Sequence, residues 1–382
     1  MGWYASWHEG YAPLAEVSWN KYTHMAFASV TTNSNSSIAL EETNTTLLQE
    51  FVSTAHNNSV KALVSVGGWD GSRFFSSSVG DATNRTAFVK ALTNMVSNYS
   101  LDGIDFDWEY PNGAGLSCNT ISPNDTSNFL SLLQELRDDP IGGSLVLSAA
   151  ASIRPWNDAT GQPSANLSDF ALVLDHIAIM DYDLFGSWSD TAGPNSALND
   201  TCAPTTAQTG SAVSAVNAWS TAGIPKDKIV LGVPSYGRSF NVSNENAFPN
   251  GTSTLALFPA FDKNNQPLGD SWDSPGVTTD ACGNESGPSG VFEFRGLIEE
   301  GYLTENGTVV DGVDYVFDDC SQTPRIYNST SQVYIAYDNA QSMAAKGSFI
   351  ASQGLRGFAI WETGGDRSDI LLDSIRSSIG FS

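Results

Sequence analysis

One segment constrains the fold and chemistry of this chain more than any other: residues 102–111, with the sequence DGIDFDWEYP. Side chains of an extended strand alternate between two faces, so Asp105, Asp107 and Glu109 share one face. Apolar residues occupy the other face. Three carboxylates in a row on an otherwise apolar strand repel one another, and some of them must hold a proton. The segment therefore predicts a strand whose acids serve acid–base chemistry.

A solvated acidic edge strand is the alternative explanation for this segment. The chain holds 42 acidic residues, so acids at these spacings are only suggestive when taken alone. However, a glycine follows the first acid, apolar residues separate the acids, and the sequence WEYP ends the run. These features favour a functional site. We also expect Pro111, two residues after Glu109, to stop the strand.

The segment resembles the Asp-x-x-Asp-x-Asp-x-Glu signature of glycoside hydrolase family 18, the chitinase family. The match is complete at Asp102, Asp105, Asp107 and Glu109. The resemblance implies that Glu109 is the general acid and, later, the base for water. The nucleophile in this family is the acetamide oxygen of the substrate's own N-acetylglucosamine, and configuration is retained. Asp107 would orient the acetamide N–H and titrate together with Asp105.

Eight apolar, strand-like segments recur along the chain. They are residues 3–5, 22–29, 61–69, 102–111, 144–151, 176–180, 229–236 and 357–361. Apolar residues recur at helical spacing between several of them, as at 86–98 and 126–137. Strands that alternate with helices predict parallel βα units, and eight units predict an α/β fold of the (β/α)8 TIM-barrel type. Functional residues in such barrels lie at the C-terminal ends of the strands, where Glu109 stands.

Residues 240–331 interrupt this alternation. They are rich in Asn, Gly, Pro and Ser, and a structureless loop of that length is uncommon in a compact domain. We predict a small α+β domain inserted after the seventh strand, with residues 1–239 and 332–382 forming the catalytic barrel. The segment resembles the insertion found at this point in many family 18 chitinases, which forms one wall of the substrate groove.

Other motifs at the strand ends resemble substrate-binding segments of the family. Residues 65–69, with the sequence SVGGW, end the third strand, and their two glycines allow close backbone approach to the acidic strand. A tight turn alone would also explain these glycines. Residues 180–183, with the sequence MDYD, end the sixth strand. The resemblance assigns Tyr182 a catalytic role, the hydrogen bond to the acetamide oxygen.

The expected substrate-binding residues are Tyr4, Phe27, Trp69, Met180, Asp183, Tyr236, Arg238 and Trp361. Trp361 stands where the family has a tryptophan beneath the cleaved sugar, and indole faces bury much apolar area in such stacking. Tyr4 and Phe27 rest on a weaker likeness. Trp188 is a candidate to extend the aromatic track. Any one of these aromatic residues taken alone would more often belong to the core.

The charge balance excludes several partners. With 17 basic and 42 acidic residues the formal net charge is −25, and such a surface repels nucleic acid and anionic lipid. No run of 18 apolar residues is present, so we expect no membrane span. The four histidines show no metal-ligand spacing, and we expect neither a metal nor a cofactor. The expected partner is chitin or N-acetylglucosamine oligosaccharides, bound by a monomer.

We expect a secreted, extracellular protein, with association with the cell wall as one option. The chain opens directly into a strand, so we expect a mature form with a start Met, and its opening GWYASW is similar to fungal family members. Thirteen Asn-x-Ser/Thr sequons begin at Asn35, Asn44, Asn57, Asn84, Asn98, Asn124, Asn166, Asn199, Asn241, Asn250, Asn284, Asn306 and Asn328. They indicate a glycosylated secretory protein, although a Ser-, Thr- and Asn-rich composition would also produce them.

The four cysteines are even in number, widely spaced and without a CxxC pair, which disfavours zinc. Three connectivities are possible. We favour Cys282–Cys320 within the inserted segment and Cys118–Cys202 between two loops, with free buried thiols as the alternative.

The leading hypothesis is a secreted chitinase that cleaves β-1,4-N-acetylglucosaminide bonds. A chitin-binding lectin on the same fold is an alternative, but such proteins usually lack the acid that Glu109 supplies. An endo-β-N-acetylglucosaminidase acting on N-glycans would share the acids but usually lacks the inserted domain. The sequence leaves endo or exo action open.

Overall fold

The computed structural model describes residues 1–40 and 44–381, and within them the predicted barrel is present. Its eight parallel strands are β1 (Gly2–Ala5), β2 (His24–Thr32), β4 (Lys61–Gly67), β5 (Gly103–Asp107), β6 (Val146–Ala151), β7 (His176–Met180), β8 (Ile229–Pro234) and β16 (Gly357–Trp361). They are hydrogen-bonded in this order, and β16 pairs with β1 to close the barrel. A short strand, β3 (Ile38–Ala39), adds antiparallel to β2. The predicted (β/α)8 fold is therefore confirmed.

The chain divides into two compact units. The first comprises Met1–Met180, Val216–Val230 and Ala281–Gly283, and the second comprises Asp181–Ala215, Leu231–Asp280 and Asn284–Ser382. Helix α6 (Ala212–Thr221) has residues in both. No helix among the described residues is long and apolar enough to span a bilayer.

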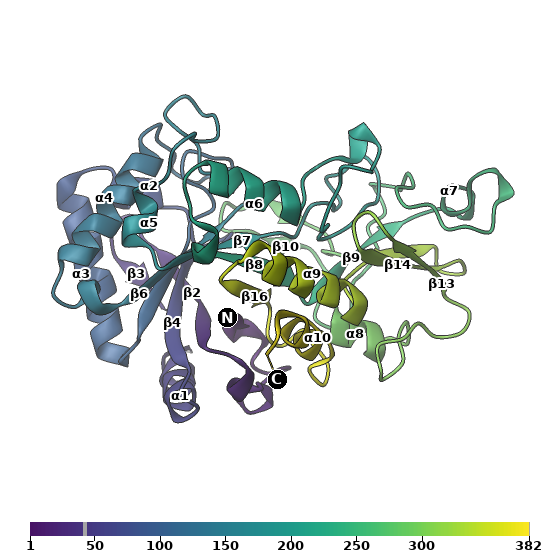
Figure 1. Ribbon diagram of the computed structural model, residues 1–382, viewed down its shortest axis with the longest axis horizontal. Helices are drawn as coiled ribbons and strands as arrows, with labels where there is room; N and C mark the ends of the chain where they lie inside the picture. Colours follow the sequence, from purple (N-terminus) through teal and green to yellow (C-terminus); the bar gives the residue numbers. More distant parts are fainter. Residues whose placement is uncertain (41–43, 382) are drawn as a thin grey trace. The chain divides into compact units, whose positions relative to one another are not determined.

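Helices cover the strands of the first unit. They are α1 (Asn44–Asn57), α2 (Phe75–Val79), α3 (Ala82–Tyr99), α4 (Asp125–Asp138) and α5 (Phe170–Val173). Helix α4 packs against both α3 and α5, and the three lie side by side in Figure 1. Helices α3 and α4 contain the two segments for which apolar spacing predicts helices. Asp81 caps α3 by accepting a hydrogen bond from the Asn84 backbone N–H.

The apolar face of β5 anchors this unit. Phe106 packs edge-on against Phe129 of α4 at 5.6 Å between ring centroids, and Trp108, just past the strand, stacks on Phe75 of α2 at 5.0 Å. All four rings are buried. Aromatic pairs of this kind contribute about 0.5–1.5 kcal/mol beyond the area they bury. The predicted alternation of apolar and acidic residues is confirmed within β5, but the strand ends at Asp107 and does not continue to Pro111 as predicted.

The second unit holds an antiparallel sheet of five strands in its described part. Its spatial order is β12 (Val291–Glu293), β9 (Tyr236–Asn241), β15 (Val333–Ala336), β14 (Thr323–Asn328) and β13 (Asp314–Asp318). The same unit contains α7 (Asn244–Ala247), α8 (Phe294–Glu299), α9 (Ala340–Gln353) and α10 (Ile370–Ile379), and α9 packs against α10 (Figure 1). The strands of this sheet lie between Tyr236 and Ala336 in the sequence, a slightly wider range than the predicted inserted domain of residues 240–331. The predicted bounds of that domain stay a prediction.

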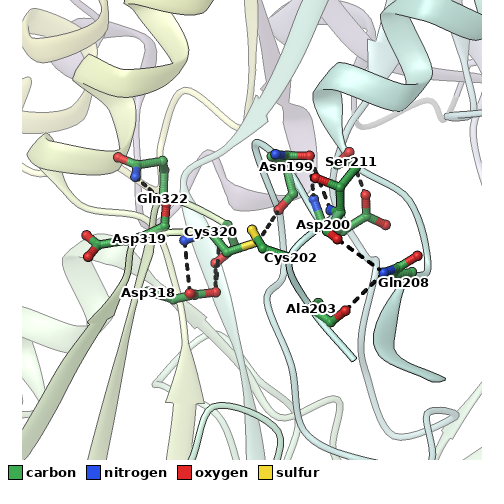
Figure 2. The surroundings of a disulfide bond; sticks show 12 residues. Asn199, Asp200, Cys202, Ala203, Gln208, Ser211, Asp318, Asp319, Cys320 and Gln322 are labelled. Atoms are coloured by element: carbon green, nitrogen blue, oxygen red, sulfur yellow. Dashed lines mark hydrogen bonds between the residues drawn. A yellow bond between two sulfur atoms is a disulfide. The ribbon is translucent and has the colours of Figure 1, made fainter. Parts of the chain in front are cut away.

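Two disulfides join Cys118 to Cys282 and Cys202 to Cys320, so the favoured pairing is wrong. Cys282 lies in the turn between β10 (Thr278–Thr279) and β11 (Glu285–Ser286), and this turn contacts the loop after β5. Cys320 lies in the turn after β13, where Asp318 accepts a hydrogen bond from its backbone N–H (Figure 2). Neighbourhood in sequence was therefore a poor guide to neighbourhood in space.

The two disulfides close chain segments of similar length. Their sequence separations are 164 and 118 residues. In the chain-entropy description, loops of these lengths each stabilise the folded state by about 5 kcal/mol. Removal of either disulfide should therefore cost similar stability.

Candidate active site

The acidic row, which consists of Asp105, Asp107 and Glu109, belongs to the first unit and is buried except at its end. Asp105 and Asp107 on β5 are 0% and 8% exposed, and Glu109, two residues past the strand, is half-buried. The Asp105 carboxylate accepts hydrogen bonds from the Trp3 indole N–H at 2.8 Å, and from the hydroxyls of Ser148 and Ser65 at 2.6 and 3.2 Å. Burial nevertheless raises the pKa of Asp105 above its usual value, because the donors offset only part of the desolvation.

The pKa of Asp107 is perturbed more strongly than that of Asp105. Burial raises the Asp107 pKa well above the usual value, and the neighbouring charges of Glu109 and Asp105 raise it further. Its Oδ1 atom is buried and has no hydrogen-bond partner among the described residues. Asp107 therefore keeps a proton at pH values where an ordinary aspartate is ionised, as the row of three acids predicted.

The SVGGW segment fixes the backbone on either side of Asp107. The Gly68 N–H donates to the Asp107 carbonyl at 2.8 Å. The Ser72 hydroxyl lies 3.0 Å from the same carbonyl and accepts from the Glu109 N–H, also at 3.0 Å. A Cβ atom on Gly67 would lie 2.2 Å from the Asp107 carbonyl oxygen. The predicted close approach of the glycines to the acidic strand is confirmed, and Ser72 extends these contacts to the Glu109 backbone.

We expect Gly67→Ala to lower the free energy of unfolding by more than about 2 kcal/mol, because Gly67 combines a φ of +109° with this contact. Gly161→Ala is the matched control, since Gly161 also has a positive φ, +77°, but has open space around it. Urea denaturation of both variants measures the difference. Equal losses would show that the approach to Asp107 has no energetic importance.

Loop 110–124 connects the acidic strand to α4, and hydrogen bonds to the Asp125 side chain hold it in place. This carboxylate is fully buried and accepts hydrogen bonds from the backbone N–H groups of Asn112 and Ser122, and from the Ser76 hydroxyl at 2.6 Å. Within the loop, the Asn119 side-chain amide donates to the Glu109 carbonyl at 3.0 Å. The backbone of Glu109 is therefore held on one side by Ser72 and on the other by Asn119.

A second polar group lies in the second unit, around Asp183. Its carboxylate accepts a hydrogen bond from the Tyr236 hydroxyl at 2.7 Å and pairs with Arg238, whose Nε also lies at 2.7 Å. The Tyr182 ring packs edge-on against Tyr236 at 6.1 Å. Burial and the Asp183 charge raise the pKa of Tyr236 well above its usual value, so its hydroxyl remains a donor. Arg238 also lies over the ring of Trp188, which is 58% exposed.

A buried charge cluster adjoins Tyr182 in the sequence. The Lys346 ammonium on α9 pairs with Asp338 at 2.5 Å and donates to the Ser196 hydroxyl at 2.7 Å. Ser196 in turn donates to Asp181 at 3.4 Å, and both acids and the lysine are at most 2% exposed. Burial raises the pKa of Asp181 to about 8, although the Lys346 charge opposes the shift. Asp181 is therefore protonated in neutral solution.

We expect Asp181→Asn to raise the free energy of unfolding relative to wild type more at pH 8 than at pH 4. The folded state favours protonated Asp181, so this residue's contribution to stability is complete below the unfolded pKa near 3.8 and is lost as pH rises to about 8. The difference in the free energy of unfolding between variant and wild type should grow by on the order of 3–5 kcal/mol over this pH range. Urea denaturation at several pH values, with exposed Asp138→Asn as control, measures it. A difference that does not change with pH would contradict protonated burial.

Comparison with known proteins places the chain in a family. The profile described as Glycosyl hydrolases family 18 matches residues 1–366. The chain belongs to glycosyl hydrolase family 18. A crystal structure of a chitinase from Rhizomucor miehei superposes with a TM-score of 0.89 at 31% identity and covers 99% of both chains.

Two curated relatives of this family 18 chain differ in how they are named. A "chitinase-like effector" from Moniliophthora perniciosa is 49% identical over 100% of this chain and 87% of its own length. Chitinase A1 from Niallia circulans is 30% identical over 85% of this chain and 43% of its own length.

The structure contradicts two of the expected substrate-binding residues of this family 18 chain. Tyr4 and Phe27 are 2% and 0% exposed, and both pack against Phe51 of α1, at 6.1 and 5.4 Å. They pair across β1 and β2, so their side chains share the face that is turned towards the helix. Trp3, on the opposite face of β1, is the residue that contacts the acidic row.

Three of the other residues that we expect to bind substrate lie at or just past the ends of strands. Trp69 is 50% exposed, and Met180 and Trp361, which end β7 and β16, are half-buried. Their binding roles stay a prediction.

Sequence reasoning overlooked the residues that support the row. Trp3, Ser148, Ser72 and Asn119 carry no motif of their own. Ser65 belongs to the SVGGW segment, whose signal for close approach to the acidic strand comes from its glycines.

Proposed function

We propose that this family 18 chain is a chitinase that cleaves β-1,4-N-acetylglucosaminide bonds with retention of configuration. The observation that carries the proposal is the intact acidic row, with the half-buried Glu109 at its end and the pKa of Asp107 raised beside it. A row of buried acids costs stability, so its use in acid–base chemistry explains why it is built.

The proposed first step breaks the glycosidic bond. Glu109 gives its proton to the leaving oxygen while the acetamide oxygen of the substrate forms a bond to the anomeric carbon, which produces an oxazolinium cation. In the second step water attacks that carbon, Glu109 takes the water proton, and the oxazolinium ring opens. Tyr182 is proposed to hold the acetamide oxygen. A positioned general acid contributes about 10²–10⁴-fold to the rate.

Asp107 would stabilise the cation. Its unpartnered Oδ1 is an acceptor suited to the acetamide N–H, and its ionisation is costly only while no positive charge is near. Formation of the cation beside Asp107 makes that ionisation favourable, and the proton that Asp107 releases passes to the neighbouring carboxylate of Asp105, whose pKa is also raised. A 2-acetamido sugar is therefore required at the cleaved position.

A specific observation favours a second candidate, a protein that binds chitin oligosaccharides without cleaving them. The 49% identical relative is named chitinase-like. The presence of Glu109 speaks against this candidate.

Incubation with chitohexaose, followed by chromatography and by calorimetric binding at low temperature, separates the two candidates. Shorter oligosaccharides support the chitinase, whereas binding without products supports the second candidate. Neither binding nor products would refute both.

We also propose that the protein is secreted. Sequons at Asn35, Asn166, Asn250 and Asn306 are exposed, and disulfides persist mainly in oxidising compartments. Protein in the culture medium whose mass falls on enzymatic removal of N-glycans would support this, and an exclusively intracellular, unglycosylated protein would refute it.

A further inference from the structure

The turn at Ala281–Gly283 is fastened to the segment that follows β4. The Ala281 N–H donates to the Asp70 carboxylate at 3.2 Å, and the Arg73 guanidinium donates to the Ala281 carbonyl at 3.4 Å. Cys282 in the same turn is bonded to Cys118, whose own N–H lies 3.1 Å from the Cys282 sulfur. The turn, residues 70–73 and Cys118 therefore form one connected patch, which we call the clamp.

The clamp continues to the general acid through adjacent residues. Asn119 follows Cys118 and donates to the Glu109 carbonyl at 3.0 Å. Thr120 donates both its N–H and its hydroxyl to the Arg73 carbonyl, each at 2.9 Å. The loop after β5 is thus tied to the clamp immediately before and immediately after the residue that holds Glu109.

The remainder of the loop gives Asn119 little other support. Among the described residues, the Asn119 Oδ1 atom is buried without a hydrogen-bond partner. The side chain of Asn119 is therefore held by the hydrogen bond that its amide N–H donates to the Glu109 carbonyl. Residues 112–115 and 117–120 are half-buried or exposed, and of residues 112–120 only Leu116 is buried. Asp125 holds the loop at Asn112 and Ser122, but the stretch between them buries so little apolar surface that it opens at low cost unless it is cross-linked.

We propose that the Cys118–Cys282 disulfide and Asn119 position the general acid Glu109, so that a turn of the inserted segment controls turnover. The proposal rests on the proposed chitinase function. Asn119 and the disulfide are positioning elements: they hold the backbone of Glu109 and do not touch the reacting atoms. Misplacement of a catalytic group by about 1 Å can cost on the order of 10²-fold in rate, so a loosened loop has a measurable effect.

The chain supplies its own control for the disulfide. The variant Cys118→Ser/Cys282→Ser removes the disulfide of the clamp, and Cys202→Ser/Cys320→Ser removes a disulfide of similar loop length whose surroundings include neither Glu109 nor Asn119 (Figure 2). Asn119→Ala removes the contact to Glu109. Its control is Asn157→Ala, because Asn157 also donates to a loop carbonyl, that of Asn112, at 2.8 Å.

Two substrates separate positioning from general loss of structure. Chitohexaose needs a proton on its leaving oxygen, whereas the nitrophenyl glycoside of di-N-acetylchitobiose expels a stable phenolate with little need of an acid. We expect Cys118→Ser/Cys282→Ser and Asn119→Ala to lower kcat on chitohexaose roughly 10-fold, and kcat on the nitrophenyl substrate less than about threefold. KM should change little, and both control variants should keep near wild-type kcat.

Hydrogen–deuterium exchange of peptides covering residues 109–124 gives a readout that does not depend on turnover. We expect faster exchange in Cys118→Ser/Cys282→Ser than in Cys202→Ser/Cys320→Ser. Equal losses of kcat in the two disulfide variants, equal losses on both substrates, or unchanged exchange would each overturn the proposal. A wild-type protein that cleaves neither substrate would refute the chitinase function and, with it, the role in turnover, while the exchange data would still decide whether the disulfide orders the loop.

Discussion

We expect Glu109→Gln to lower kcat on chitohexaose by at least about 10²-fold and to leave the oligosaccharide affinity within about threefold of wild type. Glutamine has nearly the size of glutamate but has no proton to give to the leaving oxygen. The backbone contacts of residue 109 to Ser72 and Asn119 do not involve the side chain, so the loop should keep its structure. Product chromatography and calorimetry measure the two quantities.

Glu245→Gln is the control for this experiment, because Glu245 is exposed on the second unit. It should keep wild-type turnover. Hydrolysis by Glu109→Gln near the wild-type rate would show that another group protonates the leaving oxygen. Parallel loss of binding and turnover would show instead that Glu109 acts mainly in binding.

We expect a fully de-acetylated chitosan hexamer to be cleaved at least about 10³-fold more slowly than chitohexaose. In the proposed mechanism the nucleophile belongs to the substrate, and well-oriented intramolecular groups reach effective molarities of about 10⁵ M or more. A free amine offers no acetamide oxygen, and external water cannot replace an intramolecular nucleophile at that concentration. The measurement is the initial rate of reducing-end formation at equal substrate concentration.

Binding of the de-acetylated hexamer must be measured alongside its cleavage. With a net charge of −25, the protein should attract this cationic oligosaccharide, so failure to bind is not expected to explain slow cleavage. Cleavage of both hexamers at similar rates would exclude the substrate-assisted scheme and point to a carboxylate or water as the nucleophile.

The acidic strand could be predicted because its information is local. Period-2 alternation between residues 104 and 109 specifies two faces, and the structure buries Phe106 and Trp108 on one and Asp105 on the other. The barrel followed from eight repeats of the same local pattern. Burial is the main cause of the raised pKa of Asp107, and the charges of Glu109 and Asp105, which are close to it in the sequence, raise the pKa further.

Which side chains of β1 point to the inner face of the barrel could not be predicted in the same way. All four of its residues are buried, so alternation of polar and apolar residues gives no signal, and Trp3 and Tyr4 are equal candidates for the inner face. The partner decides: Trp3 donates its indole N–H to Asp105, and Tyr4 packs on Phe51. Only the position of β1 relative to β5 and α1 separates the two residues.

Long-range pairings were also beyond local patterns. Cys118 meets Cys282 across 164 residues, because the β10–β11 turn reaches the loop after β5. Lys346 lies on an amphipathic helix, where a lysine is normally solvated, yet it is fully buried beside Asp338. Both contacts depend on where separate elements meet, which composition and periodicity do not encode.

Anomer-resolved NMR of the first products of chitohexaose cleavage is the most direct test of the proposed chemistry. Attack by the substrate's acetamide, followed by water from the other side, inverts the anomeric carbon twice. We therefore expect the newly formed reducing ends to appear first as the β-anomer and to relax slowly towards the equilibrium mixture. Products that appear first as the α-anomer would contradict the mechanism, and the absence of any product with oligosaccharide still bound would contradict hydrolysis itself.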